Sequence, residues 1–301
     1  MNVVALIVAL LLEQWRPLGD RKAWLAVAGR WARWIEESFN AGEERHGTIA
    51  WAVAVGLAVV GAAALYWVLV WVHPLLGMLL NVIALYLTLG FRQFSHHFTA
   101  IQSAARGGDM DRARELIGAW RGEPPGHRTR EEVVRLTIEE ALAASHRHVF
   151  GVLFWFMVLP GPSGAILYRL AHFVSRRWAG LGAFGRFAVK VHAILEWPAS
   201  RLTAVGFAVV GDFEDAVYCW RSQASAWPDP SQGIVLAAGA GAMGVRLGLP
   251  ISSEGGMAPR PELGVGEPAD VQYLDSTVGL LWRALVLWVF LLIVVSVARV
   301  F

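Results

Sequence analysis

Long uncharged runs constrain this chain more than any other feature of its sequence. Residues 48–72, 74–91 and 284–298 contain no charged side chain. A helix of about 20 apolar residues crosses a bilayer core that is about 30 Å thick. Charged residues make up 17% of the chain, against about 25% in soluble domains, and 56% of the residues are hydrophobic. The sequence therefore predicts an all-α fold, a polytopic integral membrane helical bundle that contacts the lipid bilayer.

Other apolar runs are interrupted or short. Residues 149–168 are uncharged, but Pro160–Pro162 lies in their middle, and proline disrupts a helix interior. Residues 3–12 and 202–211 reach only half the length of a span. We expect broken or re-entrant helices at these places. The first short run should be retained in the mature protein, because no basic residues precede it and no small-residue cleavage motif follows.

Basic residues predict which side of the membrane each connection faces. A tight turn at His73 joins the first two spans, so the segments flanking this pair face one compartment. Residues 13–47 contain six Lys/Arg and residues 92–148 contain nine, which makes both cytoplasmic. Residues 169–201 contain six more and would lie outside if 149–168 crossed fully. A re-entrant pair of half-helices at 149–168 avoids that conflict.

Capping patterns predict two helices in a cytoplasmic helical insertion over 92–148. Asp109 can cap a helix over 110–120, because its carboxylate can accept from the first free backbone N–H groups. Thr129 and Glu132 have the spacing of a capping box. The apolar stripe of this second helix extends toward the next hydrophobic run, so both parts can form one rod.

The region 212–275 differs from the rest of the chain in composition. It is rich in Gly and Pro and has nine acidic residues against three basic ones. We expect a loop-rich segment with one short helix. The glycines of 239–244 (GAGAMG) superficially resemble a nucleotide-binding loop, but no β-branched strand precedes them. Close helix packing is the preferred interpretation.

Histidines and arginines are the candidate polar ligands. Adjacent and i, i+2 residues do not share a helix face. Neither His96 with His97 nor His146 with His148 can therefore supply two ligands to one metal ion from a straight helix. We expect no metal site unless separate segments combine. Guanidinium groups near the spans suit phosphate, or serve as positive-inside anchors. The residues are His96, His97, His146, His148, His172 and His192, with Arg92, Arg147, Arg169, Arg176, Arg177 and Arg201.

Several classes of function are excluded at this stage. The net charge of +2 argues against a nucleic-acid partner. Cys219 is the single cysteine, which precludes an intrachain disulfide. The sequence contains no Walker A pattern, Rossmann fingerprint, CxxC motif or Gly-x-Ser-x-Gly motif.

Short segments spread over nearly the whole chain resemble those of a known membrane family. In chain order they are Gly108-Asp109 with Arg112-Ala113-Arg114, Val134-Arg135 with Ile138-Glu139, Val149 with Leu153-Phe154-Trp155, PSGAILYR at 162–169, Glu196-Trp197 with Arg201-Leu202-Thr203-Ala204, GVRLG at 244–248 and PELG at 261–264. They resemble the CobD/CbiB proteins of cobalamin biosynthesis and the related AmpE proteins. GVRLG and PELG are typical of the cobalamin branch, whereas the opening Leu11–Gln14 looks more like AmpE.

The cobalamin branch implies an ATP- and magnesium-dependent ligation of the adenosylcobinamide-phosphate synthase type, which joins a carboxyl of cobyric acid to aminopropanol or its phosphate. This chain departs from the family's acidic motifs. Its residues there are Ala143, Ala144 and Arg147, then His172 to Ser175, then His192 and Ala193. ATP and magnesium are therefore expected only if the family activity is retained. The polar residues left as ligand contacts are Glu139, Arg169, Arg201 and Arg246, with Arg92.

Three hypotheses follow. The first is a multi-pass protein of the bacterial inner membrane in the CobD/CbiB family, with a corrinoid or other anionic small-molecule ligand, whose lost acidic motifs argue against catalysis. The second is a non-catalytic, AmpE-like sensor or regulator of signalling in the same membrane. The third is a helical scaffold that binds a membrane partner.

Overall fold

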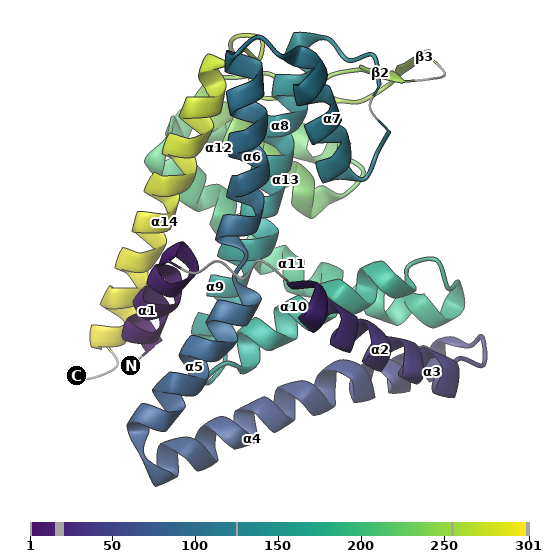
Figure 1. The fold of residues 1–301 in the computed structure, drawn as a ribbon, viewed down its shortest axis with the longest axis vertical. Coiled ribbons are helices and arrows are strands. Elements are labelled where there is room, and N and C mark those ends of the chain that lie inside the picture. The colour runs from purple at the N-terminus through teal and green to yellow at the C-terminus, as the bar shows by residue number, and fades with distance from the viewer. Residues whose placement is uncertain (1, 16–20, 125, 254–255, 299–301) are drawn as a thin grey trace. The chain divides into compact units, whose positions relative to one another are not determined.

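The computed structural model describes residues 2–15, 21–124, 126–253 and 256–298 (Figure 1). Almost all of the regular structure in these ranges is helical, which confirms the predicted all-α class. The chain forms two compact units, each built from separate stretches of sequence. Unit 1 comprises Met1–Gly90, Gly151–Pro198 and Leu292–Phe301, and unit 2 comprises Phe91–Phe150 and Ala199–Leu291.

The first stretch of unit 1 is a series of helices. They are α1 (Asn2–Trp15), α2 (Arg21–Phe39), α3 (Glu44–Trp51), α4 (Leu57–Val72) and α5 (Pro74–Thr88), with a π-helical turn at Ala52–Gly56. The predicted turn at His73 joins α4 to α5. His73 has extended backbone, and its Nδ1 accepts a hydrogen bond from the Leu75 N–H at 3.2 Å. Pro74 then opens α5, where proline's missing N–H costs nothing.

The second stretch of unit 1 contains the proline break. Helix α9 (Gly151–Val158) ends, and α10 (Ser163–Trp178) begins after the Pro-Gly-Pro segment. Gly161 adopts a positive φ of 60°, and Gly164 packs so tightly on the Trp155 carbonyl that any Cβ would overlap it. The prolines and the small glycine together permit this tight hairpin. Helix α11 (Ala183–Val210) follows and contains Pro198 in its interior.

Unit 2 contains the longest polar stretch of the chain. Its helices are α6 (Phe91–Arg106), α7 (Met110–Arg121), α8 (Arg130–Ser145), α12 (Phe213–Gln223), α13 (Pro230–Met243) and the main part of α14 (Gln272–Ala298) (Figure 1). A π-helical turn at His146–Phe150 follows α8. Two small antiparallel pairs complete the unit: β1 (Leu247–Gly248) with β4 (Glu262–Leu263), and β2 (Ile251–Ser253) with β3 (Gly256–Ala258).

Both predicted caps are confirmed. The Asp109 side chain accepts from the Arg112 N–H at 3.0 Å and starts α7. Thr129 and Glu132 form the full capping box, with bonds of 3.2 Å and 2.6 Å in the two directions. These reciprocal bonds satisfy backbone donors that a helix start otherwise leaves free. The start of α8 is therefore fixed by local chemistry.

The region 212–275 is more ordered than expected. The sequence predicted loops with one short helix, but the structure contains α12, α13 and both strand pairs. The interpretation of 239–244 as a packing surface is confirmed. A Cβ at Gly241 would overlap the backbone of Asp215, and one at Gly239 would crowd Leu142. Small residues let α13 approach its neighbours closely, and this contact orders the region.

Four helical runs are long and apolar enough to cross a membrane among the residues described. They are Glu44–Val72, Arg130–Val158, Ala183–Val210 and Gln272–Ala298. The predicted bounds differ: the run Arg130–Val158 was expected to begin at 149, and only half a span was expected at 202–211, within Ala183–Val210. The first difference arises because α8 and α9 are continuous through the π-helical turn. The shorter helix Pro74–Thr88 stands where 74–91 was predicted.

Candidate functional site

Glu139 on α8 is the best-defined polar centre of unit 2. Its side chain is only 3% exposed. Oε1 accepts a hydrogen bond from the Gly248 N–H at 2.9 Å, and Oε2 accepts one from the Arg260 guanidinium. A buried carboxylate is stable only with such partners. Glu139 therefore fastens the segment of β1 and β4 onto α8.

Backbone conformation and close packing explain why glycine occupies two positions of this segment. Gly248 has a φ of +69°, and a Cβ there would overlap the Pro261 carbonyl. Gly264 has a φ of +86°, and a Cβ there would overlap the Val245 carbonyl. Only glycine adopts such conformations without strain. The GVRLG and PELG motifs thus encode the tight strand pair that delivers the Gly248 N–H to Glu139.

Further hydrogen bonds attach the same segment to the first turns of α8. Glu132 accepts from the Ser252 N–H at 2.7 Å and from its hydroxyl at 3.0 Å. Arg135 donates to the Pro250 carbonyl at 2.8 Å and to Glu131 at 3.3 Å. Polar side chains at successive turns of one helix therefore bind successive residues of the segment.

Two guanidinium groups in this region retain unused donors. The side chains of Arg135 and Arg260 are 4% and 15% exposed, and the two interact electrostatically with Glu139 and with each other. Arg260 also lies 4.8 Å from the ring centre of Trp227. Arg135 Nε and Arg260 Nη1 are buried, with no hydrogen-bond partner among the residues that the structure describes. Orphaned cationic donors of this kind suit a carboxylate or phosphate oxygen. We call Glu139, Arg135, Arg260 and Trp227 the Glu139 site.

A neighbouring ion cluster closes the loop between α7 and α8. Glu123 accepts from Arg121 at 2.9 Å and from Arg128 at 2.5 Å. Burial opposes ionisation of Glu123, but the hydrogen bonds and charges of the two arginines outweigh it and hold its pKa below the usual range. Both carboxylate oxygens of Glu123 accept hydrogen bonds within this cluster, so its role is to stabilise the loop.

The structure separates the predicted ligand residues. Glu139 and Arg246 belong to unit 2, where Arg246 is 40% exposed and lies 3.9 Å from Glu262. Arg92 on α6 is exposed, and Arg201 on α11 is half-buried, both in unit 2. Arg169 on α10 is half-buried in unit 1. Only Glu139 takes part in the Glu139 site.

Sequence reasoning missed Arg135 and Arg260 as site residues. Arg135 was noted only as part of a family segment, and Arg260 directly precedes the PELG motif. A basic residue flanking a glycine-containing motif was the available signal. Their meeting at Glu139 depends on the pairing of segments that are 121 residues apart.

A third polar cluster lies in unit 1 and was also missed. His172 of α10 meets His192 and Glu196 of α11, and one ligand atom from each lies within 4.8 Å of the others. Sequence reasoning compared adjacent and i, i+2 histidines and passed over the i, i+4 spacing of His192 and Glu196. That spacing places both side chains on one helix face.

The donors at these places do not fit magnesium. Mg²⁺ takes oxygen ligands in octahedral geometry, usually carboxylates and water. At Glu139 both oxygens already accept hydrogen bonds. At the histidine cluster, two of the three donors are imidazole nitrogens. No step through magnesium-bound ATP is therefore assigned to either place.

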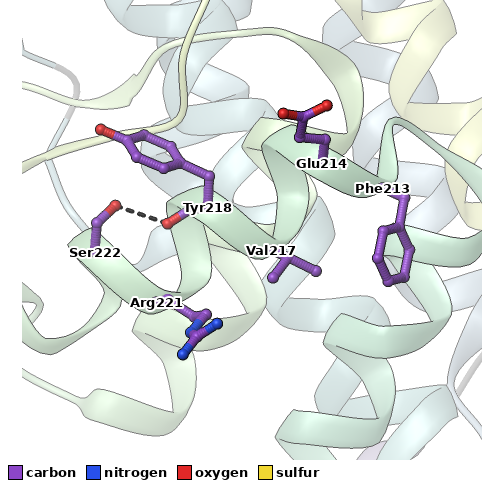
Figure 2. Close-up of a pocket in the computed structure, with 6 residues that line it drawn as sticks. All are labelled: Phe213, Glu214, Val217, Tyr218, Arg221 and Ser222. Atoms are coloured by element: carbon purple, nitrogen blue, oxygen red, sulfur yellow. Dashed lines mark hydrogen bonds between the residues drawn. The ribbon is translucent and has the colours of Figure 1, made fainter.

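An open hollow on α12 contains none of the residues discussed so far. Its lining comes from one helix face: Phe213, Glu214, Val217, Tyr218, Arg221 and Ser222 (Figure 2). Phe213 and Tyr218 are 60% and 58% exposed. The Ser222 hydroxyl donates to the Tyr218 carbonyl of the same helix. Among the residues that the structure describes, one helix alone lines this open hollow, so we assign no ligand to it.

Comparison with known proteins gives one consistent family. Residues 6–281 match the family model described as CobD/Cbib protein. The cobalamin biosynthesis protein CobD of Stutzerimonas stutzeri is 33% identical over 298 residues, covering 96% of each chain. The CobD protein of Chromobacterium violaceum is 36% identical and covers 71% of this chain and 70% of its own length. No solved structure matches this chain.

Proposed function

Because this chain belongs to the CobD/Cbib family, we propose that it acts in cobalamin biosynthesis as a multi-pass protein of a bacterial inner membrane. Its role there is to bind an anionic intermediate, a corrinoid carboxylate or a phosphate-bearing group. Two relatives named for cobalamin biosynthesis support the pathway. Several apolar helices support the membrane placement.

One observation carries the ligand class: the unused donors of the Glu139 site. Arg135 Nε and Arg260 Nη1 are buried beside Glu139 with no partner among the described residues. A buried donor without a hydrogen-bond acceptor lowers stability, and the free-energy cost is larger for a charged donor than for a neutral one. A bound carboxylate or phosphate could accept hydrogen bonds from both guanidinium groups, while the bond to Glu139 keeps Arg260 in position.

Growth is the first test of the proposal. A strain lacking its own family gene and requiring cobalamin for growth receives this chain, the Arg260→Ala variant or the Arg112→Ala variant. Arg112 is a matched control, because it is 58% exposed and pairs only with Glu115 on α7 among the described contacts. We expect rescue by the wild type and by Arg112→Ala, and reduced rescue by Arg260→Ala. Absence of rescue, with the protein present in the membrane, would contradict a role in this pathway.

Binding is the second test and separates affinity from pathway. The purified chain in detergent is titrated with cobyric acid and, separately, with ATP. A charge-assisted hydrogen bond contributes about 1.5–3 kcal/mol, so Arg260→Ala should weaken binding of the occupant about 10- to 150-fold. Equal affinity of wild type and Arg260→Ala would show that the ligand binds elsewhere.

An AmpE-like sensor is the second candidate. What favours it is that His172 and His192 stand where the resemblance leads us to expect acidic residues, and two of the three candidate ligand atoms gathered there are imidazole nitrogens. A sensor would bind the anionic ligand at the Glu139 site but would not restore cobalamin-dependent growth. The two experiments together therefore distinguish the candidates.

A further inference from the structure

We propose that His172, His192 and Glu196 in unit 1 form a binding site for a divalent first-row transition ion such as Zn²⁺. This inference is independent of the Glu139 site and of the pathway. It is based on the chemistry of the three side chains, their separations and the helices that hold them.

The separations fit the first coordination sphere of such an ion. His172 Nδ1 lies 3.1 Å from His192 Nε2, and His192 Nε2 lies 3.5 Å from Glu196 Oε1. With metal–ligand bonds of about 2.0–2.2 Å, two ligands at right angles lie roughly 3 Å apart and two at the tetrahedral angle roughly 3.4 Å apart. Both measured distances fall near this interval. All three candidate ligand atoms lie within 4.8 Å of one another.

The donor types select the class of ion. Imidazole nitrogen binds Zn²⁺ and other late first-row ions well, whereas Mg²⁺ and Ca²⁺ require oxygen. Two imidazoles with one carboxylate are a familiar zinc set, and three protein ligands leave a position for water or a substrate group. An ion bound by these three side chains would therefore keep one coordination position for an exogenous ligand.

Packing orients the ligands before any ion binds. The hydroxyl of Tyr168, a fully buried residue, donates to Glu196 Oε1 at 2.8 Å. Gly151 of α9 lies so close to the Tyr168 ring that any Cβ would overlap it. The Trp155 indole N–H donates to the Leu195 carbonyl at 3.2 Å and ties α9 to α11. Supporting hydrogen bonds of this kind raise metal affinity by fixing carboxylate orientation.

Two of the ligands lie on a candidate membrane span. His192 and Glu196 lie on the run Ala183–Val210, which is long and apolar enough to cross a membrane. Glu196 is 8% exposed and His192 is partly buried. Polar and ionisable side chains in such helices are costly and are usually kept for binding or transport. Coordination of a metal ion would offset that free-energy cost.

Metal retention by the full chain is the test. The purified, untagged protein in detergent is stripped with a chelator, loaded with Zn²⁺, desalted and analysed for metal by mass spectrometry. We expect about one Zn²⁺ per chain for the wild type and for the His96→Ala control, since His96 is an exposed histidine of α6. His172→Ala and Glu196→Gln should lose stoichiometric zinc. The same retention in these variants as in the wild type would overturn the proposal.

A conservative variant keeps the test decisive if a ligand replacement disturbs folding. Tyr168→Phe retains the ring and removes only the hydroxyl that donates to Glu196. It should weaken zinc binding about 10- to 100-fold with unchanged helicity by circular dichroism. Loading with Co²⁺ gives a second readout, because coordination by the imidazoles changes its visible absorption. Displacement of Zn²⁺ by a large excess of Mg²⁺, or an unchanged affinity in Tyr168→Phe, would refute the assignment.

Discussion

The buried pair of Glu139 and Arg260 allows a quantitative test of how unit 2 is held together. Their side chains are 3% and 15% exposed. Replacing Glu139 with leucine removes the acceptor of both the Arg260 guanidinium and the Gly248 N–H. Removing one member of a buried pair costs about 3–5 kcal/mol, because the other charge stays buried without compensation. We expect Glu139→Leu to lower the free energy of unfolding by that amount.

The double variant separates the charge from the backbone bond. In Glu139→Leu with Arg260→Met, both charges of the pair are removed, and the lasting hydrogen-bond loss is the acceptor of the Gly248 N–H. An unsatisfied buried donor costs about 1–3 kcal/mol. The double variant should therefore be more stable than Glu139→Leu alone, by about 2 kcal/mol. The free energies of the single variants would then be strongly non-additive.

Unfolding of the full chain in mixed micelles, driven by SDS and followed by circular dichroism, measures these differences. The matched control is Asp275→Asn, which breaks the ion pair with Arg106. Those side chains are 59% and 50% exposed, so the control should change stability by at most about 1 kcal/mol. If the double variant lost the sum of the single losses, the two side chains would not be coupled and the reasoning would fail.

Two further predictions concern packing and reactivity. Gly164→Ala should destabilise unit 1 by about 1–3 kcal/mol, because the new methyl group overlaps the Trp155 carbonyl, whereas Gly180→Ala, with nothing within 4 Å, should be near neutral in the same SDS titration. Burial and the nearby Asp215 carboxylate raise the pKa of the Cys219 thiol to about 11, so the thiol stays protonated at pH 8. Maleimide should label it only after unfolding, and rapid labelling of the folded chain would contradict this placement.

Local chemistry could be predicted from the sequence with good accuracy. The caps at Asp109 and Thr129 depend on bonds between residues three apart, so their spacing reveals them. The break at Pro160–Pro162 and the packing role of Gly239 and Gly241 follow from single residue types in the same way. Such features need no knowledge of the tertiary fold.

The polar clusters could be predicted only in part. Glu139 was identified because it lies in a family segment, but its partner Arg260 is 121 residues away. The meeting of His172 with His192 depends on the hairpin of α10 and α11 across 20 residues. No periodicity in one helix encodes contacts of this range. The helix bounds at Arg130 were missed because buried polar side chains masked a run that is otherwise apolar.

The run Glu44–Val72 has a practical consequence for handling the protein. Only 11% of its apolar window is buried inside the protein, against 67% for Arg130–Val158. The surrounding detergent or lipid must therefore cover nearly the whole circumference of the run Glu44–Val72. A thin detergent belt leaves part of that circumference in water and favours aggregation. Reconstitution into lipid nanodiscs is accordingly the medium in which ligand and metal titrations of this chain are best compared.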